Sequence, residues 1–100
     1  MMQVVIQKSH LPHKKLEAVI YGKKTVPFGS KNASDFTLHQ DVERTARYVN
    51  RHKKNEDWTK SGINTAGFYS KHVLWNKDTI QKSVNDLNKK YKSVNFILKS

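Results

Sequence analysis

Apolar and β-branched residues form strand-like runs in the first third of the chain. Residues 4–6 are β-branched, and two longer runs with many strand-forming residues follow at 16–21 and 24–28. A Gly-Lys step at residues 22–23 separates the two longer runs, which indicates a tight hairpin. Pro27 has no backbone N–H to donate to a neighbouring strand. We therefore expect the second strand of this hairpin to lie at an edge of the sheet or to end at Pro27.

The spacing of apolar residues changes to a helical period after residues 34–35. Between residues 41 and 54, Val42, Ala46 and Val49 recur at i, i+4 and i+7, which is the spacing of one face of an α-helix. We predict a helix over this range, with these three residues turned towards the core. Acidic residues near its start and lysines at its end complement the helix dipole.

A loop and a short helix are predicted in the middle of the chain. Residues 55–64 have no clear period and should form a loop. Helical spacing returns over residues 66–75, where Phe68, His72 and Trp75 share one face. This helix is expected to be heavily buried.

The C-terminal third predicts a final helix and a returning strand. Asn76 or Asp78 is expected to cap the helix. Apolar residues then follow at i, i+4, i+7 and i+11, namely Ile80, Val84, Leu87 and Tyr91. Residues 94–98 return to a β-like run, which we expect to pair with the N-terminal sheet.

These elements predict a single compact α+β domain over residues 1–100. A small N-terminal antiparallel β-hairpin or sheet, joined by outer strands from both ends of the chain, would pack against about three α-helices on one face. With 36% hydrophobic residues, a chain of 100 residues can enclose one modest core. The absence of cysteine excludes a disulfide framework and a thiolate metal site, which favours a cytosolic, nuclear or intravirion setting over secretion.

The chain contains no recognisable membrane signal. The apolar run within residues 1–7 has no basic region before it and no small-residue cleavage site, so we expect no signal peptide. No run approaches the roughly 20 apolar residues that a membrane span needs. We therefore expect no transmembrane association.

The charge balance is strongly positive. There are 19 lysine and arginine residues against 8 aspartate and glutamate residues, which gives a formal net charge of +11. A field of this sign attracts polyanions such as nucleic acid, anionic lipid or an acidic protein face. The composition therefore points to a class of partner and to no particular reaction.

The best candidate for such contacts is a cationic stripe on the predicted helix over residues 41–54. Its basic residues recur on the face opposite the apolar residues, where they could follow a row of phosphates. The alternative is an ordinary solvated helix face. Lysine pairs that flank the hairpin would extend the patch if the fold brings them near. The candidate contacts are Lys14, Lys15, Lys23, Lys24, Arg44, Arg47, Arg51, Lys53 and Lys54.

Four aromatic residues have the chemistry to stack on nucleic-acid bases. Helical spacing places Trp75 and Tyr69 in the core instead. Trp58 and Tyr48 remain open between the two roles. We include Trp58 among the candidate binding residues, as a stacking or anchoring group.

Catalytic and metal-binding patterns are weak. The five histidines lack the thiolates and the compact second pair of a zinc site, so we expect no metal and no cofactor. A metal-dependent nuclease built on His52, Glu56 and Asp57 is a less favoured hypothesis, because no second element of fixed spacing accompanies them. Pairing of the two acidic residues with neighbouring lysine or arginine is the simpler expectation. The sequence has no glycine-rich phosphate loop or nucleophile elbow, so we predict a non-enzymatic protein.

Several short motifs occur in a fixed order between residues 16 and 92. They are residues 28–31 (Phe-Gly-Ser-Lys), 34–37 (Ser-Asp-Phe-Thr), 51–58 (Arg-His-Lys-Lys-Asn-Glu-Asp-Trp), 66–70 (Ala-Gly-Phe-Tyr-Ser) and 74–77 (Leu-Trp-Asn-Lys). This series resembles a family of small uncharacterised proteins encoded by large nucleocytoplasmic DNA viruses of algae and amoebae and by related environmental viruses.

The resemblance implies a viral setting without a mechanism. It places the protein in the host cytoplasm or nucleus, or in the virion, and supplies no catalytic residue. Together with the charge, it leads us to expect a small basic viral protein that binds a polyanion, nucleic acid above all. The alternative is a minor capsid or scaffold protein whose partner is a viral structural protein.

Overall fold

The computed structural model describes residues 2–31, 35–39 and 41–99 of the chain. Its strands are β1 (Met2–Lys8), β2 (Lys14–Ile20), β3 (Lys24–Ser30) and β4 (Val94–Leu98). Its helices are α1 (Phe36–His39), α2 (Val42–His52), α3 (Ala66–Tyr69) and α4 (Ile80–Lys90), with a 3-10 turn η1 (Lys60–Gly62) and a π-helical segment η2 (Ser70–Leu74). The α+β class predicted from the sequence is confirmed. Within the residues described, no helix is long and apolar enough to cross a membrane.

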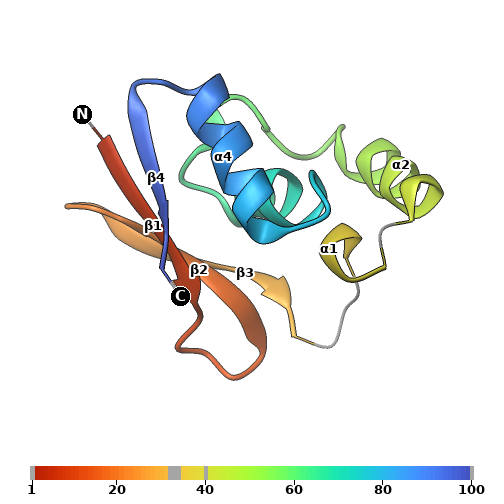
Figure 1. Ribbon diagram of the computed structural model, residues 1–100, viewed down its shortest axis with the longest axis horizontal. Helices are drawn as coiled ribbons and strands as arrows, with labels where there is room; N and C mark the ends of the chain where they lie inside the picture. Colours follow the sequence, from red (N-terminus) through yellow and green to blue (C-terminus); the bar gives the residue numbers. More distant parts are fainter. Residues whose placement is uncertain (1, 32–34, 40, 100) are drawn as a thin grey trace.

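The strands form one sheet in the order β3-β2-β1-β4 (Figure 1). β2 and β3 make the predicted antiparallel hairpin. Its turn contains Gly22 at φ 75°, a left-handed conformation that glycine adopts without steric cost. Pro27 lies in the edge strand β3, as predicted, and β4 returns to pair in parallel with β1.

The place of the N-terminal strand differs from the prediction of outer strands from both ends of the chain. β4 is an outer strand, but β1 lies inside the sheet, between β2 and β4. Val4 and Ile6 of β1 are fully buried. A β-branched run buries the most apolar surface in a central strand, because strands pair with it on both sides and helices cover one of its faces.

The segments α3, η2 and α4 cover one face of this sheet, whereas α1 and α2 lie beyond the end of β3 (Figure 1). Inward-facing sheet residues pack against side chains from α3, η2 and α4 to form one core. Its fully buried members include Val4, Ile6, Ala18, Phe28, Phe68, Tyr69, Val73 and Leu87. The position of α2 at the margin of this core leaves a cleft between it and the hairpin.

α2 forms where the sequence predicts it, with the Asp41 side chain capping its N-terminus, but it buries a different face. The predicted apolar stripe is wrong: Val42 is 73% exposed, Ala46 is also exposed and Val49 is half-buried. Tyr48 is the buried residue of the helix. A helix at the edge of a small core can bury only a narrow strip, and one aromatic ring removes more surface from water than valine and alanine do.

The predicted helix over residues 66–75 is helical over residues 66–74, and its type changes within that range. Thr65 caps α3, and the chain continues from Ser70 as the π-helical segment η2. Phe68 and His72 are buried, as predicted. Trp75 follows η2 with a non-helical backbone (φ −118°, ψ 33°), so it leaves their common face; it is half-buried and stacks on Tyr48 of α2.

α4 confirms the predicted final helix but not its predicted cap. The capping side chain is Thr79, which accepts a hydrogen bond from the backbone N–H of Lys82. Asn76 instead donates to Asp86 at 2.8 Å, and Asp78 pairs with Lys82 at 3.1 Å. Both predicted caps therefore have other partners, and the helix begins after them.

A buried histidine makes the stability of this fold depend on pH. His72 is 4% exposed, and its Nε2 donates a hydrogen bond to the carbonyl of Trp58 at 2.8 Å. Burial lowers the pKa of His72 to about 4. The folded protein therefore holds this ring neutral, whereas the unfolded chain protonates it at about pH 6.5. The free energy of unfolding falls as the pH falls through this window from about 6.5 towards 4.

We expect His72 to reduce the free energy of unfolding by about 2 kcal/mol between pH 7 and pH 5. Urea unfolding at the two pH values measures this loss. The variant His72→Gln keeps an N–H donor for Trp58 and removes the titration, so its stability should fall less over the same interval. An equal fall in both proteins would assign the pH dependence to other groups.

Candidate functional site

A cleft of about 640 Å³ lies between the hairpin and α2. The start of β2 and the end of β3 form one wall, and the inner side of α2 forms the other. Side chains and backbone of α3 and η2 contribute the floor, with Gly67 and Leu74 among them. Segments that are far apart in the sequence therefore meet around one hollow.

Five cationic side chains line this cleft, from two parts of the chain. Arg44, Arg47 and Arg51 come from one side of α2, where spacings of three and four residues place them together. Lys14 and Lys15 come from the start of β2. Two carboxylates, of Asp35 and Glu56, also line the cleft, which leaves an excess of three positive charges.

The first of these carboxylates is bound within the protein. Asp35 is 2% exposed, and the Lys15 ammonium donates to its Oδ2 at 2.5 Å. The backbone N–H and the hydroxyl of Thr37 donate to its other oxygen, Oδ1. Lys15 is therefore largely compensated, and it fixes the start of β2 to the segment before α1.

The second carboxylate also has its partners inside the protein. His52 Nδ1 lies 2.9 Å from Glu56 Oε2, and the indole N–H of Trp58 donates to Glu56 Oε1 at 2.9 Å. The Glu56 side chain is 23% exposed, so it lies deeper than the arginines of α2. These contacts tie the loop after α2 back to the helix.

The arginines of α2 have little compensation of this kind. Arg47 lies 4.0 Å from Glu43, in a pair whose side chains are 65% and 89% exposed. Such exposed pairs contribute little. Arg44 and Arg51 form no salt bridge with any described residue. Their charge is therefore available to a ligand in the cleft.

The rings of Tyr48, His52 and Trp75 form one aromatic group in the lining. Tyr48 lies 4.3 Å from Trp75 with an interplanar angle of 5°, and 4.3 Å from His52 at 31°. Two rings at such short centroid distances must lie on opposite faces of Tyr48. Burial, together with the negative charge of Glu56, raises the pKa of Tyr48 to about 12, so this residue stays neutral at physiological pH.

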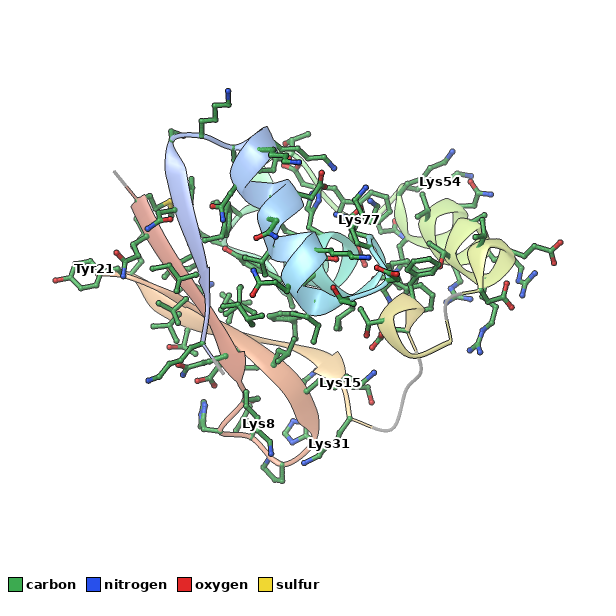
Figure 2. All side chains as sticks on the ribbon, viewed as in Figure 1. Lys8, Lys15, Tyr21, Lys31, Lys54 and Lys77 are labelled. Atoms are coloured by element: carbon green, nitrogen blue, oxygen red, sulfur yellow. The ribbon has the colours of Figure 1, made fainter. Side chains whose placement is uncertain are left out.

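Lys23 and Lys24 do not join the cleft. Lys24 pairs with Ile20 and Lys14 with Ser30, so the two lysine pairs lie at opposite ends of the hairpin, about 20 Å apart. Figure 2 shows Tyr21, beside the turn, pointing away from the helices at the end opposite Lys15. The predicted patch is thus extended by one lysine pair and not by the other.

The remaining candidates also lie outside the lining. Lys53 is the C-cap of α2, and Lys54 projects from the end of the helix (Figure 2). Trp58 anchors the loop: besides its bond to Glu56, its carbonyl accepts hydrogen bonds from His72 and from the Tyr91 hydroxyl. Of the two roles considered for Trp58, anchoring is the one that this geometry supports.

The residues of the nuclease hypothesis do not converge. His52 and Glu56 are in contact, but the Asp57 carboxylate accepts hydrogen bonds from Thr59 and Ser61. Among the side chains that the structure describes, the partners of these two acidic residues are His52, Trp58, Thr59 and Ser61, and not the expected lysine or arginine. In the part of the chain that the structure describes, no group of three histidine, aspartate or glutamate side chains could hold a metal ion.

Sequence reasoning did not place Asp35 or Trp75 in the site, and it left Tyr48 open between a stacking role and a core role. The pattern Asp-x-Thr at residues 35–37 is a signal for a local turn and would have indicated a structural carboxylate. The Tyr48–Trp75 stack joins residues 27 positions apart, one on α2 and the other directly after η2. No local pattern predicts such a contact.

Comparisons with known proteins give limited information. No curated protein and no solved structure matches the chain. None of the comparisons points to an enzymatic activity. Residues 4–52, from β1 to the end of α2, are similar to DUF5754, described as a family of unknown function.

Proposed function

We propose that this protein is a non-enzymatic binder of nucleic acid and that the cleft between the hairpin and α2 is its binding site. The observation that carries the proposal is the meeting of two separate cationic segments. Lys14 comes from β2, and Arg44, Arg47 and Arg51 come from α2, more than 25 positions later in the sequence. The viral setting stays a proposal, supported by the motif resemblance over residues 16–92.

Arginine chemistry supports phosphate as the group bound. A guanidinium presents a planar fork of donors that matches two phosphate oxygens, and it stays charged at any physiological pH. Three such groups on one side of a helix can contact successive phosphates with little rearrangement. The two internal carboxylates of the cleft are already bound by Lys15 and His52, so they compete only weakly for the arginines.

A comparison with the lysines of α4 also supports the cleft as the binding site. Lys82 pairs with Asp78 at 3.1 Å, and Lys90 pairs with Asp86 at 3.1 Å. Two of the three lysines of α4 therefore have a carboxylate partner, which reduces the attraction of this helix for an extended anion. The excess of positive charge is therefore more concentrated at the cleft.

Fluorescence anisotropy with labelled oligonucleotides across a salt series tests the proposal. Affinity should fall linearly with the logarithm of the salt concentration. Lys14→Ala and Arg51→Ala should each lower the slope by about 0.7 for a single strand or about 0.9 for a duplex. Lys24→Ala carries the same change of charge at the far end of the hairpin and should leave the slope unchanged. Absence of binding at low salt would contradict the proposal and favour an acidic protein partner in a virion.

A further inference from the structure

We propose that the cleft takes single-stranded nucleic acid, with the phosphates at its rim and at least one unpaired base inside. This inference rests on the proposed function and adds the form of the ligand. It follows from three properties of the cleft: its concavity, the positions of its charges and its aromatic lining.

Concavity is the first property. A cleft of about 640 Å³ has the size of sites that enclose part or all of one small ligand. In a duplex the bases are paired and stacked, and turning one out costs a few kcal/mol. A duplex could therefore touch only the rim, whereas a single strand can place a base in the hollow without that cost.

The charges are arranged to keep phosphate at the rim. Arg44, Arg47 and Arg51 are all exposed, so they reach a backbone that passes over the opening. The carboxylates lie deeper, with 3% of the Asp35 side chain and 23% of the Glu56 side chain exposed. A phosphate inside would meet these like charges. A neutral base would not, and it would find apolar surface there.

The lining supplies surfaces on which a base can stack. His52 and Trp75 lie on the two faces of the neutral Tyr48 ring, and all three residues line the cleft. His52 and Trp75 are half-buried, so each keeps part of its surface accessible. A base placed against either ring continues the stack. Base–aromatic stacking contributes about 1–3 kcal/mol per base in single-strand binding sites.

The test compares a labelled homothymidine strand with a hairpin duplex that has the same number of phosphates. Wild-type protein should bind the strand about tenfold more tightly than the duplex at the same salt concentration. In the variant Trp58→Phe, Trp75 is the sole tryptophan, since the chain has two. Its emission should change on addition of the strand and stay unchanged on addition of the duplex.

The outcomes separate this inference from the proposed function. Equal affinity for strand and duplex would overturn the inference and leave the basic cleft as a general phosphate site. A preference for the strand with unchanged Trp75 emission would overturn entry of a base into the cleft. Absence of binding to either probe would overturn the proposed function itself. The affinity ratio is measured on the wild-type protein, so it does not depend on folding of the variant.

Discussion

Replacement of Arg44, Arg47 and Arg51 together by glutamate should reduce nucleic-acid affinity about 100-fold or more at physiological salt. Three phosphate contacts contribute close to two orders of magnitude to the binding constant under these conditions, and charge reversal adds repulsion. The three side chains are exposed. We therefore expect circular dichroism and thermal unfolding to remain close to those of the wild type, with anisotropy reporting the loss of binding.

A matched control separates the cleft from net charge. Lys23, Lys24 and Lys92 are exposed and lie at the end of the sheet away from the cleft, the first two at the β2–β3 turn and the third in the turn before β4. Their replacement by glutamate changes the net charge by the same amount. Because surface charges are screened beyond about 8 Å at physiological salt, this variant should retain most of its affinity. Equal losses in the two variants would show that binding follows overall charge and would contradict a localised site.

Replacement of Gly62 by alanine should lower the free energy of unfolding by about 3 kcal/mol. A Cβ atom at this position would lie 1.9 Å from the carbonyl oxygen of Asp57 and 2.8 Å from its carbonyl carbon. These are backbone atoms and cannot move aside as the end of a flexible side chain can. The loop from Glu56 to Gly62 would have to open, and with it the contacts of Glu56 with His52 and Trp58.

Thermal unfolding measures this effect as a fall in Tm of roughly 12–24 °C for a domain of this size. Gly22→Ala is the control, because a Cβ there meets nothing within 4 Å. It introduces only the strain of a left-handed conformation at φ 75°, about 1 kcal/mol. Similar stability in the two variants would show that the loop can relax around the added methyl group.

Local sequence patterns predicted much of the fold. Two strand-forming runs around the Gly22-Lys23 step predicted the hairpin, and the missing backbone N–H of Pro27 predicted its edge position. The period of 3.6 gave α2 and α4, because each contains enough residues for a repeat to be seen. Residues 94–98 formed the predicted returning strand. These features are set by residues close together in the sequence, so they can be predicted from one sequence alone.

The features that the sequence did not predict depend on tertiary packing. Val42 has the spacing of a core residue, yet α2 lies at the margin of the core and buries Tyr48 against Trp75 instead. Both lysine pairs that flank the hairpin look alike in the sequence. They differ in the structure because α2 lies beside the end of the hairpin that carries Lys14, and not beside the end that carries Lys24.

The most direct test of the central claim, that the cleft between the hairpin and α2 binds nucleic acid, is an amide chemical-shift titration of the labelled protein with a homothymidine strand. We expect the largest changes at residues 14–15, 28–30, 44–52 and 66–75, four separated segments that meet only at the cleft. Changes centred on residues 21–24 and 92, or spread evenly over the lysines of the surface, would contradict the claim.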